Sequence, residues 1–170
     1  APPEPQLEVT FRPVTSATLV CPELAVTAGS AAVAGSLVAP GMAGAGGTAA
    51  LEALGSDEPL ARIASPAAPV HLLMSGSTQP PVLTRAIGGW APAALSGFAM
   101  RALDGVAAGL SSGACPVPRA TWWFVGPGSQ VGRSSVLLVV NPSQEPARID
   151  ISLYGRSGPV PALAGKGVVV

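Results

Sequence analysis

Charged side chains are scarce in this sequence of 170 residues. Asp, Glu, Lys and Arg make up 11% of the chain, against roughly 25% in an average soluble domain. Nine basic residues balance nine acidic ones. Binding to nucleic acid needs a basic surface that displaces counterions from phosphates, so this balance argues against a nucleic-acid partner. The same neutrality argues against docking on an anionic membrane surface.

Groups that perform catalysis or hold metals are equally few. The single histidine, His71, lies in a strand-like run, and no G-x-S-x-G motif supplies a nucleophile for it. The acidic residues do not cluster: Asp57 and Glu58 have the pattern of a solvated turn, and Asp150 faces outward from its expected strand. Two cysteines and one histidine do not readily form a zinc site. We therefore expect no enzymatic activity, no cofactor and no metal.

Small apolar residues and chain breakers are, in contrast, abundant. Hydrophobic residues make up 48% of the chain, which also contains 21 glycines and 19 prolines. Proline removes a backbone donor and glycine costs backbone entropy, so long helices are excluded, whereas short strands joined by turns tolerate both. High hydrophobicity with low charge also argues against disorder. The composition predicts an all-β domain with Ala/Gly/Pro-rich loops.

One uncharged stretch, residues 24–51, requires a membrane span to be considered. It contains six glycines, Pro40 and only three leucines, and so falls short of the roughly 20 strongly apolar residues that a spanning helix needs. We expect no membrane span here. Residues 40–47 are instead expected to form a mobile loop, and residues 48–54 a helical turn capped by Thr48.

Alternation of apolar and polar residues predicts strands along much of the chain. Residues 6–12 alternate regularly, which is typical of a half-buried strand, and residues 14–21 continue the pattern. Further strands are expected at residues 31–38, 60–64, 70–74, 82–87, 98–103, 106–110 and 121–125.

The most regular pattern lies near the C-terminal end. Residues 135–140 end in an unbroken apolar run, as expected of a central strand buried on both faces. A polar turn at 141–146 precedes a clean alternation at 147–154, and residues 155–158 predict another turn. With the strand at 121–125, these segments predict a β-meander of the kind found in immunoglobulin-like β-sandwiches.

The two cysteines, Cys21 and Cys115, are expected to form a disulfide rather than remain as two buried thiols. An even number of cysteines in a low-charge, Lys-poor chain fits an oxidising compartment. The bond would close a loop that contributes roughly 4 to 5 kcal/mol in the chain-entropy model. It would tie together either one sandwich over residues 1–170 or two β lobes with a boundary near 115–120.

Two further predictions concern the ends of the sequence. The chain begins at Ala1 without an initiator Met or a leader, and it stops in an apolar run at 168–170. We expect a mature exported domain whose signal has been removed and whose C-terminal end is truncated. Such an end would leave a β edge open, where a second copy could pair to form a homodimer.

An ordered series of motifs near the C-terminal end carries a resemblance to a known family. The series runs from Cys115-Pro116 through Trp122-Trp123-Phe124-Val125-Gly126 and Gly132-Arg133 to Leu137–Pro142. Over about residues 98–160 it resembles an uncharacterised family of actinobacterial secreted proteins, classed as a domain of unknown function. The resemblance implies export and a β fold. It supplies no activity, cofactor or catalytic residue.

Tryptophan side chains are the best candidates for a binding surface. Adjacent residues of a strand point to opposite faces, so we expect one of Trp122 and Trp123 to pack inside, near the cysteines. The other is either covered by the Ala/Gly-rich loop, the usual outcome for a large aromatic, or exposed for stacking on sugars or partner side chains. Trp90 is a weaker candidate. Arg133 could bond a loop carbonyl or a ligand anion.

These observations predict a non-catalytic β module of the secreted or cell-envelope class, with a scaffold or protein-interaction role. The alternative is a module that binds cell-wall glycan through an exposed tryptophan. An exposed tryptophan in a groove with polar neighbours would favour the alternative, and fully buried tryptophans would count against it.

Overall fold

The structure is a computed structural model that describes residues 12–23, 30–75, 80–103, 108–126, 131 and 135–170. The strand expected at 6–12 lies outside these residues except for Arg12, and the first two residues of the strand expected at 106–110 lie outside them as well.

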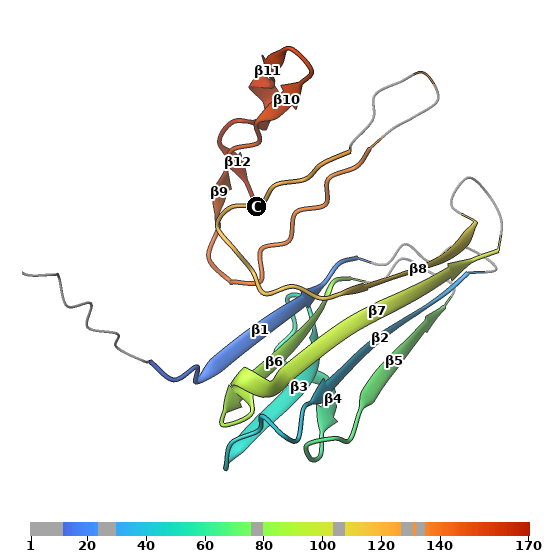
Figure 1. Ribbon diagram of the computed structural model, residues 1–170, viewed down its shortest axis with the longest axis vertical. Coiled ribbons are helices and arrows are strands. Elements are labelled where there is room, and N and C mark those ends of the chain that lie inside the picture. The colour runs from blue at the N-terminus through green and yellow to red at the C-terminus, as the bar shows by residue number, and fades with distance from the viewer. Residues whose placement is uncertain (1–11, 24–29, 76–79, 104–107, 127–130, 132–134) are drawn as a thin grey trace, which may run out of the picture.

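Two four-stranded antiparallel sheets pack face to face as an immunoglobulin-like β-sandwich, as the composition and the strand pattern predict (Figure 1). The hairpins β3–β4 and β7–β8 each stay within one sheet, whereas the other connections between β1 and β8 cross to the opposite sheet. The first sheet has the order β1 (Ser16–Cys21), β6 (Val82–Gly88), β3 (Gly47–Ala53) and β4 (Pro59–Ile63). The second has the order β5 (Val70–Ser75), β2 (Ala31–Val38), β7 (Ala94–Ala102) and β8 (Gly109–Ala114).

The core lies between the two sheets and consists mainly of small side chains. Strand β2 shows the cause: its even-numbered residues, from Ala32 to Val38, are buried, and its odd-numbered residues are not. This period of two follows from the pleat of a strand. Leu51 of β3 and Leu83 of β6 are the largest fully buried side chains. The many alanines therefore form the interior of the sandwich.

The segment 48–54 is not a helical turn, and that prediction is wrong. It forms most of β3, which pairs with β6 on one side and with β4 on the other. Ala49 and Leu51 point into the core with 4% and 0% of their surface exposed. Pairing on both sides outweighs the helix preference of alanine, because intrinsic propensity is weaker than tertiary contacts.

The loop predicted at 40–47 lies between β2 and β3, with its last residue, Gly47, already in the strand. Two backbone hydrogen bonds hold it against Gly89: Gly44 N donates to Gly89 O, and Gly89 N donates to Gly46 O, each at 2.7 Å. The loop therefore packs against the end of β6.

A cluster of hydroxyl groups is buried between the sheets. Ser36 Oγ lies 2.6 Å from Thr84 Oγ1 and 2.8 Å from Ser96 Oγ, and Thr84 Oγ1 donates to Ser96 Oγ at 3.0 Å. Ser96 Oγ in turn donates to the carbonyl oxygen of Gly35 at 3.1 Å. The three hydroxyls satisfy one another, as buried polar groups generally must. They link β2 and β7 of one sheet to β6 of the other.

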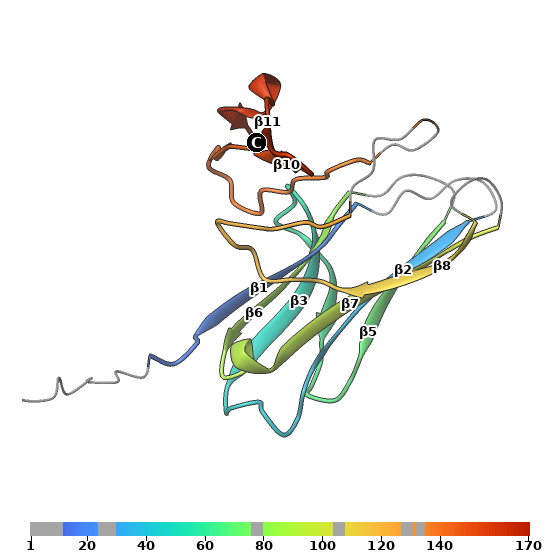
Figure 2. The same cartoon turned by 45° about the horizontal axis from the view of Figure 1, so that its top comes forward.

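The described residues 116–126, 131 and 135–170 form a C-terminal segment that extends beyond the sandwich (Figures 1 and 2). It contains two short antiparallel ladders, which pair β9 (Arg148–Ile149) with β12 (Val168–Val169) and β10 (Leu153–Gly155) with β11 (Gly158–Val160). The helical elements among the residues that the structure describes are two three-residue 3-10 turns, η1 (Ala91–Ala93) and η2 (Leu163–Gly165). Across the described residues, no helix is long and apolar enough to cross a membrane.

The β-meander predicted for the C-terminal segment does not form. Residues 121–125 are not a strand, and residues 135–140 are neither a strand nor buried, since Val136 is 90% exposed. The strand predicted at 147–154 is divided between β9 and β10. Alternation reports a local preference for extended backbone, whereas a strand also requires a neighbour with which to pair. In the described part of the chain, no neighbouring strand reaches 121–125 or 136–140.

Candidate functional site

Cys21 and Cys115 form the predicted disulfide. Cys21 ends β1 and Cys115 follows β8, so the bond joins the edge strands of the two sheets. Both cysteines are buried, with 1% and 2% of their surface exposed. Next to the bond, Val20 N donates to Pro116 O at 2.9 Å, so the chain that leaves the disulfide runs along the edge of β1. The site is structural, and it fixes the point from which the C-terminal segment departs.

His71 lies on the outer face of β5, opposite Gly35 of β2. Alternation places it away from the core, and its side chain is exposed. Among the residues that the structure describes, no hydroxyl or carboxyl group pairs with it, and no three potential metal ligands gather anywhere. No nucleophile or acid among the described residues is therefore hydrogen-bonded to His71.

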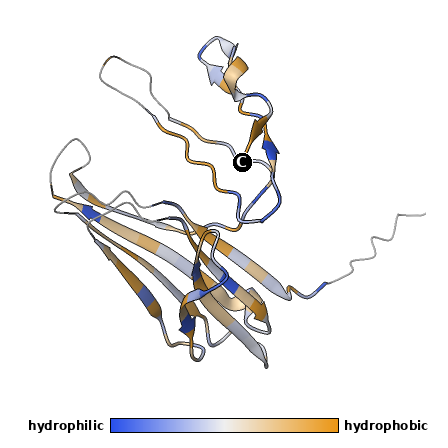
Figure 3. Cartoon of the chain, turned by 180° about the vertical axis from the view of Figure 1, so that it is seen from behind, coloured by the Kyte–Doolittle hydropathy of each residue, from blue (hydrophilic) through white to orange (hydrophobic). Residues whose placement is uncertain are grey.

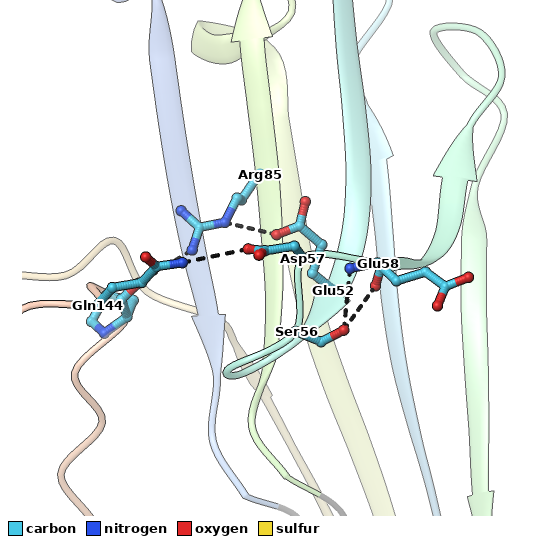
Figure 4. Close-up of polar contacts among 7 residues, drawn as sticks. Glu52, Ser56, Asp57, Glu58, Arg85 and Gln144 are labelled. Atoms are coloured by element: carbon cyan, nitrogen blue, oxygen red, sulfur yellow. Dashed lines mark hydrogen bonds and ion pairs between the residues drawn. The ribbon is translucent and has the colours of Figure 1, made fainter.

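Arg85 of β6 and Asp57 of the β3–β4 turn contact the polar turn at 141–146, and Glu52 pairs with Arg85 (Figure 4). Arg85 Nε donates to Glu52 Oε2 at 2.8 Å, and Arg85 Nη2 donates to Pro142 O at 3.2 Å. Gln144 Nε2 donates to Asp57 Oδ1 at 3.4 Å. The outer face of β3 and β6 thus holds the C-terminal segment through exposed polar contacts, each of which is individually weak.

Asn141 organises the turn itself. Its Nδ2 donates to Glu145 O at 2.7 Å and to Val170 O at 3.1 Å, while its Oδ1 accepts from Ser143 N at 3.1 Å. This Asx-type arrangement explains why an asparagine opens the turn. The predicted turn is confirmed, and it connects the sandwich to the β9–β12 ladder.

Trp122 and Trp123 are both exposed, with 45% and 77% of their surface accessible. The expectation that one of them packs inside near the cysteines is wrong, because residues 121–125 have no strand partner that would carry them into the core. Trp122 stacks with Phe124 at 6.2 Å between ring centroids, and the guanidinium carbon of Arg119 lies 5.7 Å from the Trp122 ring.

Trp123 points to a different partner. Its ring lies 5.8 Å from that of Tyr154 in β10, at an interplanar angle of 35°. Tyr154 is itself 62% exposed. The two adjacent tryptophans thus contact different neighbours, and the Trp123–Tyr154 pair joins the run at 121–125 to the hairpin β10–β11 in an accessible position.

Trp90 is part of the sandwich and does not form a surface with the other tryptophans. It precedes η1, is half-buried and packs against the core. A Cβ atom added at Gly47 would lie 2.6 Å from Cδ1 of Trp90, so glycine at position 47 makes room for the ring. Arg133, the remaining candidate, lies outside the described residues.

This difference between the tryptophans leads to a prediction. Trp90→Ala is expected to lower the free energy of unfolding by about 2 kcal/mol, because it removes a ring packed on the core. Trp123→Ala is expected to cost less than about 1 kcal/mol, since its ring loses mainly the contact with Tyr154. Urea unfolding of both variants measures the two values. Equal losses would contradict the assignment of Trp90 to the core and Trp123 to the surface.

Exposed apolar side chains gather on the C-terminal segment, and we call this group the C-terminal apolar surface. Sequence reasoning missed most of it: Phe124 could have been found from its position beside two tryptophans, but nothing marked Tyr154 as their neighbour. Figure 3 shows that the runs at 121–125 and 135–140 are largely hydrophobic. The members are Trp122, Trp123, Phe124, Val125, Val136, Leu137, Leu138, Val139 and Tyr154, with exposed fractions between 37% and 99%.

Comparison with known protein families yields a match over the C-terminal part of the chain. Residues 70–170 match the family described as "Family of unknown function (DUF5719)". No curated protein and no solved structure matches the chain. The matched region begins at β5 and includes the C-terminal apolar surface. It covers more than half of the sequence, and the chain therefore belongs to this family of unknown function.

Proposed function

We propose that the chain is a non-catalytic, extracytoplasmic β module that binds a protein partner through the C-terminal apolar surface. The observation that carries the proposal is the exposure of Trp123, Phe124 and Val125, at 77%, 62% and 99%, on a segment outside a complete sandwich. Exposed aromatic side chains can stack on partner side chains, and large exposed apolar areas mark interaction sites.

The composition of this surface favours a protein partner. Tryptophan, tyrosine, phenylalanine and arginine are enriched at the centres of protein interfaces, and charged residues other than arginine are depleted there. The surface contains three kinds of aromatic ring, with Arg119 beside Trp122. No acidic residue occurs in the sequence between Asp104 and Glu145. Rigid aromatic side chains of this kind supply binding energy at a low cost in conformational entropy.

The disulfide supports the extracytoplasmic part of the proposal. Disulfides persist in oxidising compartments and are rare in the cytosol. The bond between Cys21 and Cys115 is buried and connects the two sheets, as expected of a structural disulfide. The resemblance of the Cys115 to Pro142 series to actinobacterial secreted proteins points in the same direction, and a location in the actinobacterial envelope is part of this proposal.

Site-specific crosslinking in the native envelope tests the proposal. A photoreactive phenylalanine analogue at position 123 is expected to form a covalent adduct with a protein. The same analogue at position 71, which is also exposed but lies on the sandwich outside the surface, serves as the control. An adduct that depends on position 123, and that is lost when Phe124→Ala is added, supports the proposal. Equal labelling from both positions, or none, contradicts it.

A second function, glycan binding, is favoured by one observation, the exposed pair of Trp123 and Tyr154. Aromatic faces of this kind stack on sugar rings. Titration with solubilised cell-wall polysaccharide would then shift the tryptophan fluorescence in a saturable way, and Tyr154→Ala would remove the shift. An absence of any shift, combined with a protein adduct from position 123, leaves the protein-partner function alone.

A further inference from the structure

Leu83 is buried on a face of the first sheet that no second sheet covers. Its neighbour Thr84 points between the sheets, where it joins the hydroxyl cluster, so alternation along β6 places Leu83 and Arg85 on the outer face. Outward residues of a sandwich are normally solvated. Leu83 nevertheless has 2% of its surface exposed, and Ala50, on the same face of β3, has 9%. This part of the outer face is therefore covered by something other than the opposite sheet.

The polar turn at 141–146 reaches this part of the sheet. Pro142 O accepts from Arg85 Nη2 at 3.2 Å, and Arg85 lies on the same face of β6 as Leu83. Pro142 and the residue before it are half-buried, whereas residues 135–139 are exposed. Glu52, which is opposite Leu83 in the register of β3 and β6, has only 18% of its side chain exposed. Among the described residues of the C-terminal segment, this turn is the part that hydrogen-bonds to β6.

The described part of the C-terminal segment contributes no side chain to the core. None of its described residues is buried. Where the segment leaves the disulfide, Val20 N donates to Pro116 O at 2.9 Å, and the turn adds the bonds to Arg85 and Asp57. Polar contacts between exposed groups are individually weak. The segment could therefore leave the first sheet without breaking the core or the disulfide, as a local opening.

Net charge also draws the two parts of the chain together. The sequence up to Cys115 contains seven acidic and four basic residues, and the sequence beyond it contains two acidic and five basic residues. The first part is therefore net negative and the C-terminal part is net positive. Salt screens the attraction between exposed charges, so contact between the two parts is expected to weaken as the ionic strength rises.

We propose that the turn at 141–146 is a latch that closes the C-terminal segment over Leu83. When the latch opens, the segment swings away from the first sheet while the disulfide keeps it attached. Arg85 is the positioning residue of the latch, because Glu52 Oε2 accepts from its Nε at 2.8 Å and so directs the guanidinium at Pro142. Opening exposes Leu83 and moves the C-terminal apolar surface relative to the sandwich. This device does not depend on the proposed function, since it operates whatever that surface binds.

Solvent paramagnetic relaxation of leucine methyl groups, with a neutral gadolinium chelate as the probe, tests the proposal. In the unmodified protein, the methyls of Leu83 are expected to be as protected as those of Leu51. Arg85→Gln is expected to raise the relaxation at Leu83 by at least about twofold and to leave Leu51 unchanged. Arg62→Gln is the matched control, because Arg62 is exposed and lies opposite Ala50 on the other side of β3, on the same face.

Small-angle X-ray scattering separates movement of the segment from a local uncovering of Leu83. Arg85→Gln is expected to increase the radius of gyration. Salt at about 1 M, where the screening length is about 3 Å, is expected to do the same in the unmodified protein, so this arm of the test needs no variant. Urea unfolding confirms that each variant is folded. No change at Leu83 in Arg85→Gln, an equal change in Arg62→Gln, or a change at Leu83 with an unaltered radius of gyration overturns the proposal.

Discussion

Replacing Cys21 and Cys115 together with alanine is expected to lower the free energy of unfolding by roughly 4 to 5 kcal/mol. The two cysteines are separated by 94 positions, so the bond restrains most of the unfolded chain. In the chain-entropy model, the stabilisation grows with the logarithm of that loop length. The total stability of a domain is typically about 5 to 15 kcal/mol, so the expected loss is at least about a quarter of it.

Urea unfolding of the variant and of the unmodified protein, followed by fluorescence, measures this loss. The unmodified protein in the presence of a reductant provides the control. Because the bond is buried, reduction is expected only after partial unfolding, and the reduced protein should then match the double variant. A loss below about 1 kcal/mol, with thiol titration confirming that the unmodified bond is intact, would show that the denatured chain remains restrained without the bond.

Leu51→Ala is expected to lower the free energy of unfolding by about 3 kcal/mol. Leu51 lies on the inner face of the central strand β3 and has none of its surface exposed. Its removal leaves a cavity between the sheets, because the paired strands on either side prevent the core from collapsing to fill it. The core contains many alanines, so few neighbouring side chains are long enough to reach into the space.

Leu60→Ala in the adjacent strand β4 is the matched control for this prediction. Leu60 is 52% exposed, so the same chemical change there is expected to cost less than about 1 kcal/mol. Urea unfolding of both variants provides the comparison. Similar losses would mean that the contact between the sheets does not depend on the inner face of β3.

Several strands of the sandwich could be predicted from the sequence because they show their own alternation of apolar and polar residues. The prediction at 31–38 coincides with β2, and those at 70–74 and 82–87 lie within β5 and β6. The segment 48–54 was mispredicted because alanine and leucine are strong helix formers, and its strand identity comes from β4 and β6. Local patterns locate a strand only where they agree with its tertiary neighbours.

The C-terminal segment shows the opposite relation between pattern and structure. Residues 135–140 have the strongest strand pattern in the sequence, yet residues 135–139 are exposed and no residue of this run lies in a strand. Composition determines what a segment prefers, but it does not determine which other segment lies beside it. For the same reason the sequence could indicate that Trp123 is a binding candidate but could not identify Tyr154 as its neighbour.

The cluster of buried hydroxyl groups could not be predicted from the sequence, for a different reason. Ser36, Thr84 and Ser96 lie far apart in the sequence, and each alone resembles an ordinary strand residue. Only the packing of the two sheets brings them together. In contrast, the disulfide was predictable because cysteine is rare here and its chemistry allows few pairings.

The position of the disulfide determines how the module would respond to mechanical force. Tension applied between the N-terminal side of β1 and the C-terminal segment passes through Cys21 and Cys115, because the bond connects those two points directly. The chain between them, from β2 to β8, bears no tension while the disulfide is intact. Its contour length of about 330 Å is therefore not extended. Such a force could detach the short strand β1 and unfold the C-terminal ladders. It would not extend the rest of the sandwich until the disulfide was reduced.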